Sequence, residues 1–180
     1  MAKTNDIKIN LKLILIFIPV AYASYLFHEF GHWIVGELLG NDMTYSLNNA
    51  SVKIGHYIDA SHELYVSIGG PAFTILQSVI FFFILRKFRT IYVYPLLFFP
   101  MFMRFFSLVF GGFSKQDEAR ISAILGIGSY TIAIIVLLVL ILIVLRASQL
   151  LRINLKTNAY FFSISVFCQL LVIATYKIFL

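Results

Sequence analysis

The stretch LKLILIFIPVAYASYLFHEFGHWIVGELL, residues 11–39, decides the fold of this chain. It is an apolar run longer than the roughly 20 residues that a helix needs to cross a bilayer. Its second half nevertheless carries His28, Glu29 and His32. The run predicts a membrane-spanning helix, and because ionisable groups are costly inside a membrane, these three side chains indicate a functional site.

The composition supports a membrane protein. The chain has 180 residues, of which 61% are hydrophobic and 12% are charged, whereas a soluble domain has about half apolar and about a quarter charged residues. This excludes a water-soluble monomer and a disordered chain. The 14 Lys and Arg residues give a formal net charge of +6, but they form no dense basic run, so nucleic acid is not an expected partner. The single cysteine, Cys168, excludes an intrachain disulfide.

Four more apolar segments are long enough to cross the bilayer, which gives an all-α polytopic membrane protein with about five transmembrane helices. The segments are residues 64–85, 91–112, 121–145 and 157–176. Pro95 and Pro100 predict a kink or a late start in the third span, and Gly126 and Gly128 predict close helix packing in the fourth. We expect one membrane-embedded domain over residues 1–180, with its core in residues 10–120 and two additional spans in residues 121–180.

Basic residues predict the orientation of the spans. Positive charge favours the cytoplasmic side of a membrane, and nine basic residues fall on one side of the predicted topology: Lys3, Lys8, Lys12, Arg86, Lys87, Arg89, Arg146, Arg152 and Lys156. The N-terminus is therefore expected in the cytoplasm, and the second half of the first span toward the outer side. We expect an integral protein of a bacterial cytoplasmic membrane. An alternative reading takes Ala21-Tyr22-Ala23 as a signal-peptide cleavage site, but the apolar run continues well past it.

The long polar segment between the first two spans, residues 41–63, predicts a small β-hairpin in the first outer loop. Apolar residues alternate on either side of the turn signal Asn48-Asn49, namely Met43, Tyr45, Leu47, Val52 and Ile54. An exposed strand edge could pair with an extended peptide. A plain ribbon at the membrane interface fits the same pattern.

The motif at residues 28–32 carries metal chemistry. On a helix, His28 and His32 project from one face and can bind one zinc ion, with Glu29 near enough to take a proton from water. A catalytic zinc site has three protein ligands and one open position, and the metal lowers the pKa of water to about 7. The alternative is that the three side chains are simply hydrated at a helix end.

The third ligand must come from another part of the chain. The candidates are Glu37, His56, Asp59, His62, Glu63, Asp117 and Glu118. The loop after the third span returns to the side of the motif, which favours Asp117, followed by Glu118 and His62. Asp117 could instead form a helix-capping box with Ser114. Arg104, in the third span, is expected to pair with Glu37 or Asp117 or to polarise a carbonyl group.

Three sequence features together resemble the site-2 protease family of intramembrane zinc metalloproteases. They are the motif at residues 28–32, the triplet Gly69-Gly70-Pro71 and the later aspartate Asp117, and they span about residues 10–120. The resemblance implies zinc bound by His28, His32 and Asp117, with Glu29 as general base. Thr74 stands where the family has an asparagine, and Asp117 lies between Gln and Glu rather than in the family's Leu-Asp-Gly.

The function expected from these features is a zinc-dependent endopeptidase that cleaves a peptide bond within or near the membrane. Its expected partners are a transmembrane protein substrate, the lipid bilayer and a regulatory membrane protein. Gly69, Gly70 and Pro71 are expected to break the second helix locally and to line the substrate cavity, unless they form an ordinary helix start. The alternative function is a non-catalytic metal-binding scaffold or regulator.

Overall fold

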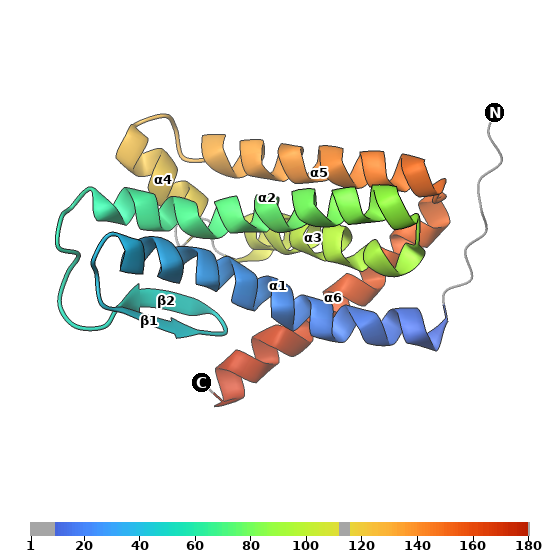
Figure 1. Ribbon diagram of the computed structural model, residues 1–180, viewed down its shortest axis with the longest axis horizontal. Helices are drawn as coiled ribbons and strands as arrows, with labels where there is room; N and C mark the ends of the chain where they lie inside the picture. Colours follow the sequence, from blue (N-terminus) through green and yellow to red (C-terminus); the bar gives the residue numbers. More distant parts are fainter. Residues whose placement is uncertain (1–9, 112–115, 180) are drawn as a thin grey trace.

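The computed structural model describes residues 10–111 and 116–179, and it confirms a helical protein with a small hairpin after the first helix (Figure 1). Its elements in chain order are α1 (Leu11–Leu38), β1 (Met43–Ser46), β2 (Asn49–Val52), α2 (His62–Phe88), the 3-10 turn η1 (Ile91–Val93), α3 (Pro95–Phe110), α4 (Asp117–Leu125), α5 (Thr131–Leu151) and α6 (Leu155–Phe179). Within the described residues, five segments are long and apolar enough to cross a membrane, namely α1, α2, η1 with α3, α5 and α6. The late start of the third span is confirmed, because α3 begins at Pro95.

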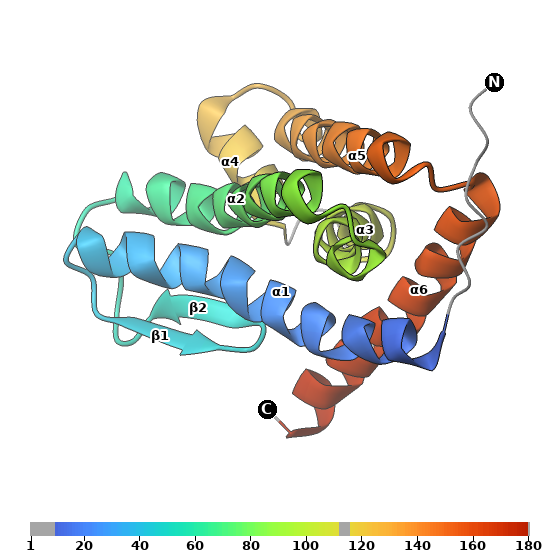
Figure 2. The ribbon, with the colours of Figure 1, turned by 45° about the vertical axis from the view of Figure 1, so that its right-hand side comes forward.

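The hairpin lies beside the second half of α1 (Figures 1 and 2). Its strands are antiparallel, with Met43 opposite Val52 and Ser46 opposite Asn49. The turn is therefore Leu47-Asn48, one residue earlier than the predicted Asn48-Asn49. The Tyr45 hydroxyl donates a hydrogen bond of 2.6 Å to the carbonyl oxygen of Leu26, which holds the hairpin against α1.

Helices α1 and α2 run side by side and touch through two glycines. A Cβ atom on Gly31 would overlap the carbonyl of Gly69, and a Cβ atom on Gly69 would overlap the carbonyl of Gly31. Such small residues let helix backbones approach closely in a membrane. The prediction that α2 breaks at Gly69-Gly70-Pro71 is wrong, because the helix is continuous through this triplet.

The fourth predicted span is also corrected. Residues 121–145 are not one helix, because α4 ends at Leu125 and α5 begins at Thr131. Gly126 and Gly128 have φ angles of 65° and 86°, a left-handed conformation that glycine adopts readily and that ends helices. A Cβ atom on Gly126 would meet no described residue within 4 Å, so this glycine terminates α4 and does not serve helix packing.

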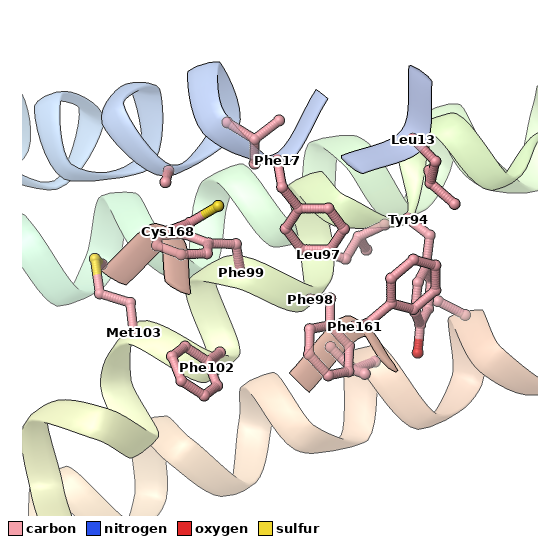
Figure 3. Packing of buried hydrophobic residues seen from close by; sticks show 14 of the residues in the cluster. Leu13, Phe17, Tyr94, Leu97, Phe98, Phe99, Phe102, Met103, Phe161 and Cys168 are labelled. Atoms are coloured by element: carbon pink, nitrogen blue, oxygen red, sulfur yellow. The ribbon is translucent and has the colours of Figure 1, made fainter. Parts of the chain in front are cut away.

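A cluster of large aromatic side chains packs between the first half of α1, α3 and α6 (Figure 3). The Phe161 ring of α6 lies 5.5 Å from that of Phe17, 5.2 Å from that of Tyr94 and 5.8 Å from that of Phe98. Cys168 is a buried free thiol in the same cluster. These contacts join α1, α3 and α6, whereas the hairpin and α4 lie at the other end of the bundle, on opposite sides of α1 and α2 (Figure 1).

Candidate metal centre

Three potential metal ligands converge between α1 and α4. His28 Nε2 and His32 Nε2 each lie 3.2 Å from Asp117 Oδ2, and the two nitrogens lie 3.3 Å apart. Ligand atoms at about 2.0 Å from a tetrahedral divalent ion are separated by about 3.3 Å. The triangle therefore has the dimensions of one face of a tetrahedral metal site.

The other nitrogen of each imidazole is held by α2. His32 Nδ1 lies 2.6 Å from the carbonyl oxygen of Val66, which can only accept, so Nδ1 carries the hydrogen. His28 Nδ1 lies 2.9 Å from the Thr74 hydroxyl, and that hydroxyl donates its own hydrogen to the carbonyl oxygen of Gly70 at 3.1 Å. His28 therefore also donates from Nδ1, and both Nε2 atoms face Asp117, as in metal sites whose second imidazole nitrogen is fixed by a hydrogen bond.

The chemistry of this donor set fits a metal ion. Asp117 Oδ2 faces the Nε2 lone pairs of two imidazoles that carry their hydrogen on Nδ1. Three electron-pair donors at this separation repel one another unless a cation lies between them, and His28, His32 and Asp117 could together hold a metal ion.

The two adjacent glycines of α2 have different neighbours. A Cβ atom on Gly70 would overlap His32 Nε2 and lie 2.6 Å from His28 Cε1. Gly70 therefore provides the space that the two imidazoles occupy, whereas Gly69 meets the backbone of Gly31. Pro71 is buried within the same helix.

The site opens into a cavity of about 370 Å³. Glu29 is 8% exposed and lies in the cavity wall together with the three candidate ligands. The wall also contains Tyr25 of α1, Asn48 of the hairpin turn and Tyr57 of the segment before α2. Arg104 of α3, Arg120 of α4, and Gln169 and Tyr176 of α6 add to its polar part. Among the described residues of α2, Val66 is the one that lines the cavity, so Gly69, Gly70 and Pro71 lie behind the candidate ligands and not in the cavity wall.

The other candidates for the third ligand have different partners or lie apart. Glu37 accepts a hydrogen bond of 2.9 Å from the backbone nitrogen of Met43, and Asp59 accepts one of 2.7 Å from the backbone nitrogen of Ser61. His62 Nδ1 lies 3.2 Å from the side-chain nitrogen of Asn41, and Glu63 lies 3.8 Å from Arg120. His56 is exposed. Ser114, the predicted capping partner of Asp117, lies outside the described residues.

Arg104 pairs with Glu118 and not with Glu37 or Asp117. The distance from Arg104 Nη1 to Glu118 Oε1 is 3.2 Å, and the two side chains are 9% and 2% exposed. Arg104 was detectable as the one charge in the third apolar segment, whereas nothing in the sequence marks Glu118 as its partner. Sequence reasoning also missed the hydrogen bonds of Thr74 and Val66 to the imidazoles, because a threonine or a carbonyl in an apolar helix gives no signal of its own.

Comparison of this chain with known proteins identifies no relative. No family model matches the sequence, and neither the curated proteins nor the solved structures contain a significant match.

Proposed function

We propose that this protein is a zinc-dependent endopeptidase that hydrolyses a peptide bond within or next to the membrane. The observation that supports this best is the presence of Glu29 and the three candidate ligands in one cavity of an apolar helical bundle. Two imidazoles and one carboxylate are a typical zinc donor set that leaves a fourth position open.

Each residue has a defined part in the proposed reaction. His28, His32 and Asp117 would hold a zinc ion, which would lower the pKa of water and polarise a carbonyl group when bound. Glu29 accepts a proton from the attacking water and delivers it to the nitrogen of the leaving amine. A bond forms between the water oxygen and the carbonyl carbon, and the bond from that carbon to nitrogen breaks. Val66 and Thr74 keep the imidazoles oriented throughout.

The proposed substrate is a transmembrane protein, because the site lies among helices that can cross a bilayer. The polar wall of the cavity provides a place for water at membrane depth. We further propose a bacterial cytoplasmic membrane as the location, with the N-terminus in the cytoplasm and the zinc site toward the outer side. A regulatory membrane protein that limits access to the cavity is part of the same proposal.

The test compares the wild-type protein with Glu29→Gln and with Glu37→Gln, a matched control on the same helix. Each purified protein is loaded with zinc and reconstituted in liposomes with single-span test proteins in ¹⁸O-labelled water. Mass spectrometry then identifies new carboxyl termini that carry the label. We expect cleavage by the wild type and by Glu37→Gln, and a loss of at least about 100-fold in Glu29→Gln with zinc retained.

Two results would contradict the proposal. Unchanged processing by Glu29→Gln would show that the cleavage does not use Glu29 as its general base. One zinc ion per chain with no labelled product from the wild type would favour the second candidate, a non-catalytic metal-binding scaffold or regulator, which the converging ligands fit equally well.

A further inference from the structure

Arg104 is a buried cation in the wall of the cavity, next to the candidate metal ligands. Its Nη1 atom lies 3.2 Å from Glu118 Oε1 and 3.4 Å from His28 Nε2. Its Nη2 atom donates a hydrogen bond of 3.3 Å to the Ser107 hydroxyl. One nitrogen of this guanidinium thus faces both an acid and the nitrogen of His28 that points toward Asp117.

The ion pair between Arg104 and Glu118 is made through a single pair of atoms. Arg104 Nε and Glu118 Oε2 are buried without a hydrogen-bond partner among the described residues. Strong arginine–carboxylate pairs commonly use two parallel hydrogen bonds. The observed geometry is therefore not the one expected for a pair whose task is to fasten α3 to α4, and it turns Nη1 toward the metal ligands.

Arg104 loses one of its hydrogen-bond acceptors when a metal ion is bound to His28. Because His28 donates from Nδ1 to Thr74, the lone pair of His28 Nε2 is the acceptor for Arg104 Nη1. A metal ion held by His28 uses that same lone pair. One N–H of Arg104 then needs another acceptor, since a buried donor without a partner is costly.

We propose that Arg104 is a catalytic residue that donates this N–H to the carbonyl oxygen of the scissile peptide bond. The oxygen gains negative charge as water attacks the carbonyl carbon, and a fixed cationic donor stabilises that charge more than it stabilises the neutral carbonyl. Glu118 is a positioning residue that holds the guanidinium and compensates its charge beside a divalent ion. This assignment rests on the proposed peptidase function and adds the group that binds the reacting carbonyl.

The charges provide a way to separate this role from a structural one. If Arg104 only supported the ligands, its removal would displace His28 or Asp117 and weaken zinc binding. If Arg104 acts on the carbonyl, its removal leaves the ligands in place and takes a positive charge away from the neighbourhood of a cation. Zinc affinity then stays the same or rises while hydrolysis slows, so the two roles predict opposite changes.

The test uses the double variant Arg104→Gln/Glu118→Gln, which replaces the buried ion pair by two neutral amides and leaves no charge uncompensated. Arg104→Lys is the second variant and keeps the charge opposite Glu118. Arg146→Gln, which replaces an exposed arginine of α5, is the control. For each protein, zinc affinity is measured by chelator competition, and kcat and KM are measured on a test protein that the wild type cleaves.

We expect kcat to fall by about 10²–10³-fold in the double variant, with little change in KM, as for the loss of one oxyanion-binding donor. The zinc dissociation constant should be unchanged, because the double variant removes one charge of each sign, and the control should behave as the wild type. A smaller fall in kcat with the same zinc affinity is expected for Arg104→Lys, and its results decide the question if the double variant does not fold.

Two results would overturn the assignment of Arg104. A loss of zinc affinity of about tenfold or more would give Arg104 a structural role at the ligands. A kcat within about threefold of the wild-type value would show that the carbonyl does not depend on it. In either case, loss of cleavage in Glu29→Gln would leave the proposed peptidase mechanism intact, whereas undiminished cleavage in that variant would show that the measured hydrolysis does not depend on Glu29 and would reject that mechanism.

Discussion

The two ends of the helical bundle differ in what fills the space between the helices. At the end away from the hairpin, the space between α1, α3 and α6 is filled by large rings, with Phe17 and Phe161 completely buried. At the hairpin end, α1 and α2 approach through glycines that have no side chain. The space around the approach holds imidazoles, carboxylates and a cavity of about 370 Å³.

This difference separates the residues that maintain the fold from those that maintain the site. Lipid chains are as apolar as the side chains they surround, so helices in a membrane associate through packing contacts and hydrogen bonds. At the aromatic end, large buried side chains make the packing contacts between helices. At the hairpin end, a polar cavity takes the place of such side chains, and the helices are held by backbone contact and by hydrogen bonds between polar groups. Substitutions at the two ends should therefore affect stability and metal binding independently.

The largest expected effect is the loss of metal at the hairpin end with the aromatic end intact. His32→Ala and Asp117→Ala each remove one of three ligands, so we expect the zinc content of purified protein to fall from one ion per chain to nearly none. His56→Ala and Asp59→Ala, which replace exposed residues, should retain the ion. Elemental analysis of detergent-purified protein measures this. Zinc retained by Asp117→Ala would remove Asp117 from the ligand set.

The converse change should destabilise the fold and leave the site intact. Phe161→Ala removes a completely buried ring from the aromatic cluster, which we expect to cost about 3 kcal/mol because the packing contacts are lost and a cavity remains. Phe167→Ala, on the same helix, removes a ring that is 62% exposed and should cost much less. Unfolding in mixed detergent micelles measures both. Equal losses in the two variants would contradict the difference in packing, and loss of zinc from folded Phe161→Ala would contradict the independence of the two ends.

Two adjacent glycines at the hairpin end, Gly69 and Gly70, should separate an effect on stability from an effect on metal binding. In Gly69→Ala the new methyl group meets the backbone of Gly31, so the helices must separate, and we expect a destabilisation of about 1–3 kcal/mol. In Gly70→Ala the methyl group meets the imidazole tips of His28 and His32, which can turn away. That variant should fold nearly normally but lose at least about tenfold in zinc affinity. Thermal unfolding and chelator competition on both variants would show whether the effects divide in this way or fall together.

The sequence predicted the features that depend on composition and order. The five apolar spans, the hairpin and the meeting of His28 and His32 with Asp117 follow from hydropathy, alternation and the side on which each loop returns. These features need no knowledge of how the helices pack. The position of the hairpin turn was wrong by one residue, because Leu47 belongs to the turn and continues the alternation at the same time.

Packing details could not be predicted in the same way. Gly69, Gly70 and Pro71 suggested a broken helix, but their role depends on Gly31 and the imidazoles of another helix. Gly126 and Gly128 lie in an apolar run, where hydropathy does not distinguish a packed glycine from one with positive φ. The pairing of Arg104 with Glu118 depends on the path of the chain between α3 and α4, which local sequence patterns do not encode.

The smallest expected effect comes from a contact between α2 and the site. Thr74 accepts a hydrogen bond from His28 Nδ1 and donates one to Gly70, and this pair of bonds leaves the His28 Nε2 lone pair free for a metal ion. Thr74→Val keeps the shape of the side chain and removes the acceptor, so the imidazole can adopt the other tautomer or rotate. We expect zinc affinity to fall by about tenfold, with little change in stability. Thr74→Ser keeps the hydroxyl and should restore binding, whereas zinc affinity unchanged in Thr74→Val would mean that packing against α2 is sufficient to orient His28.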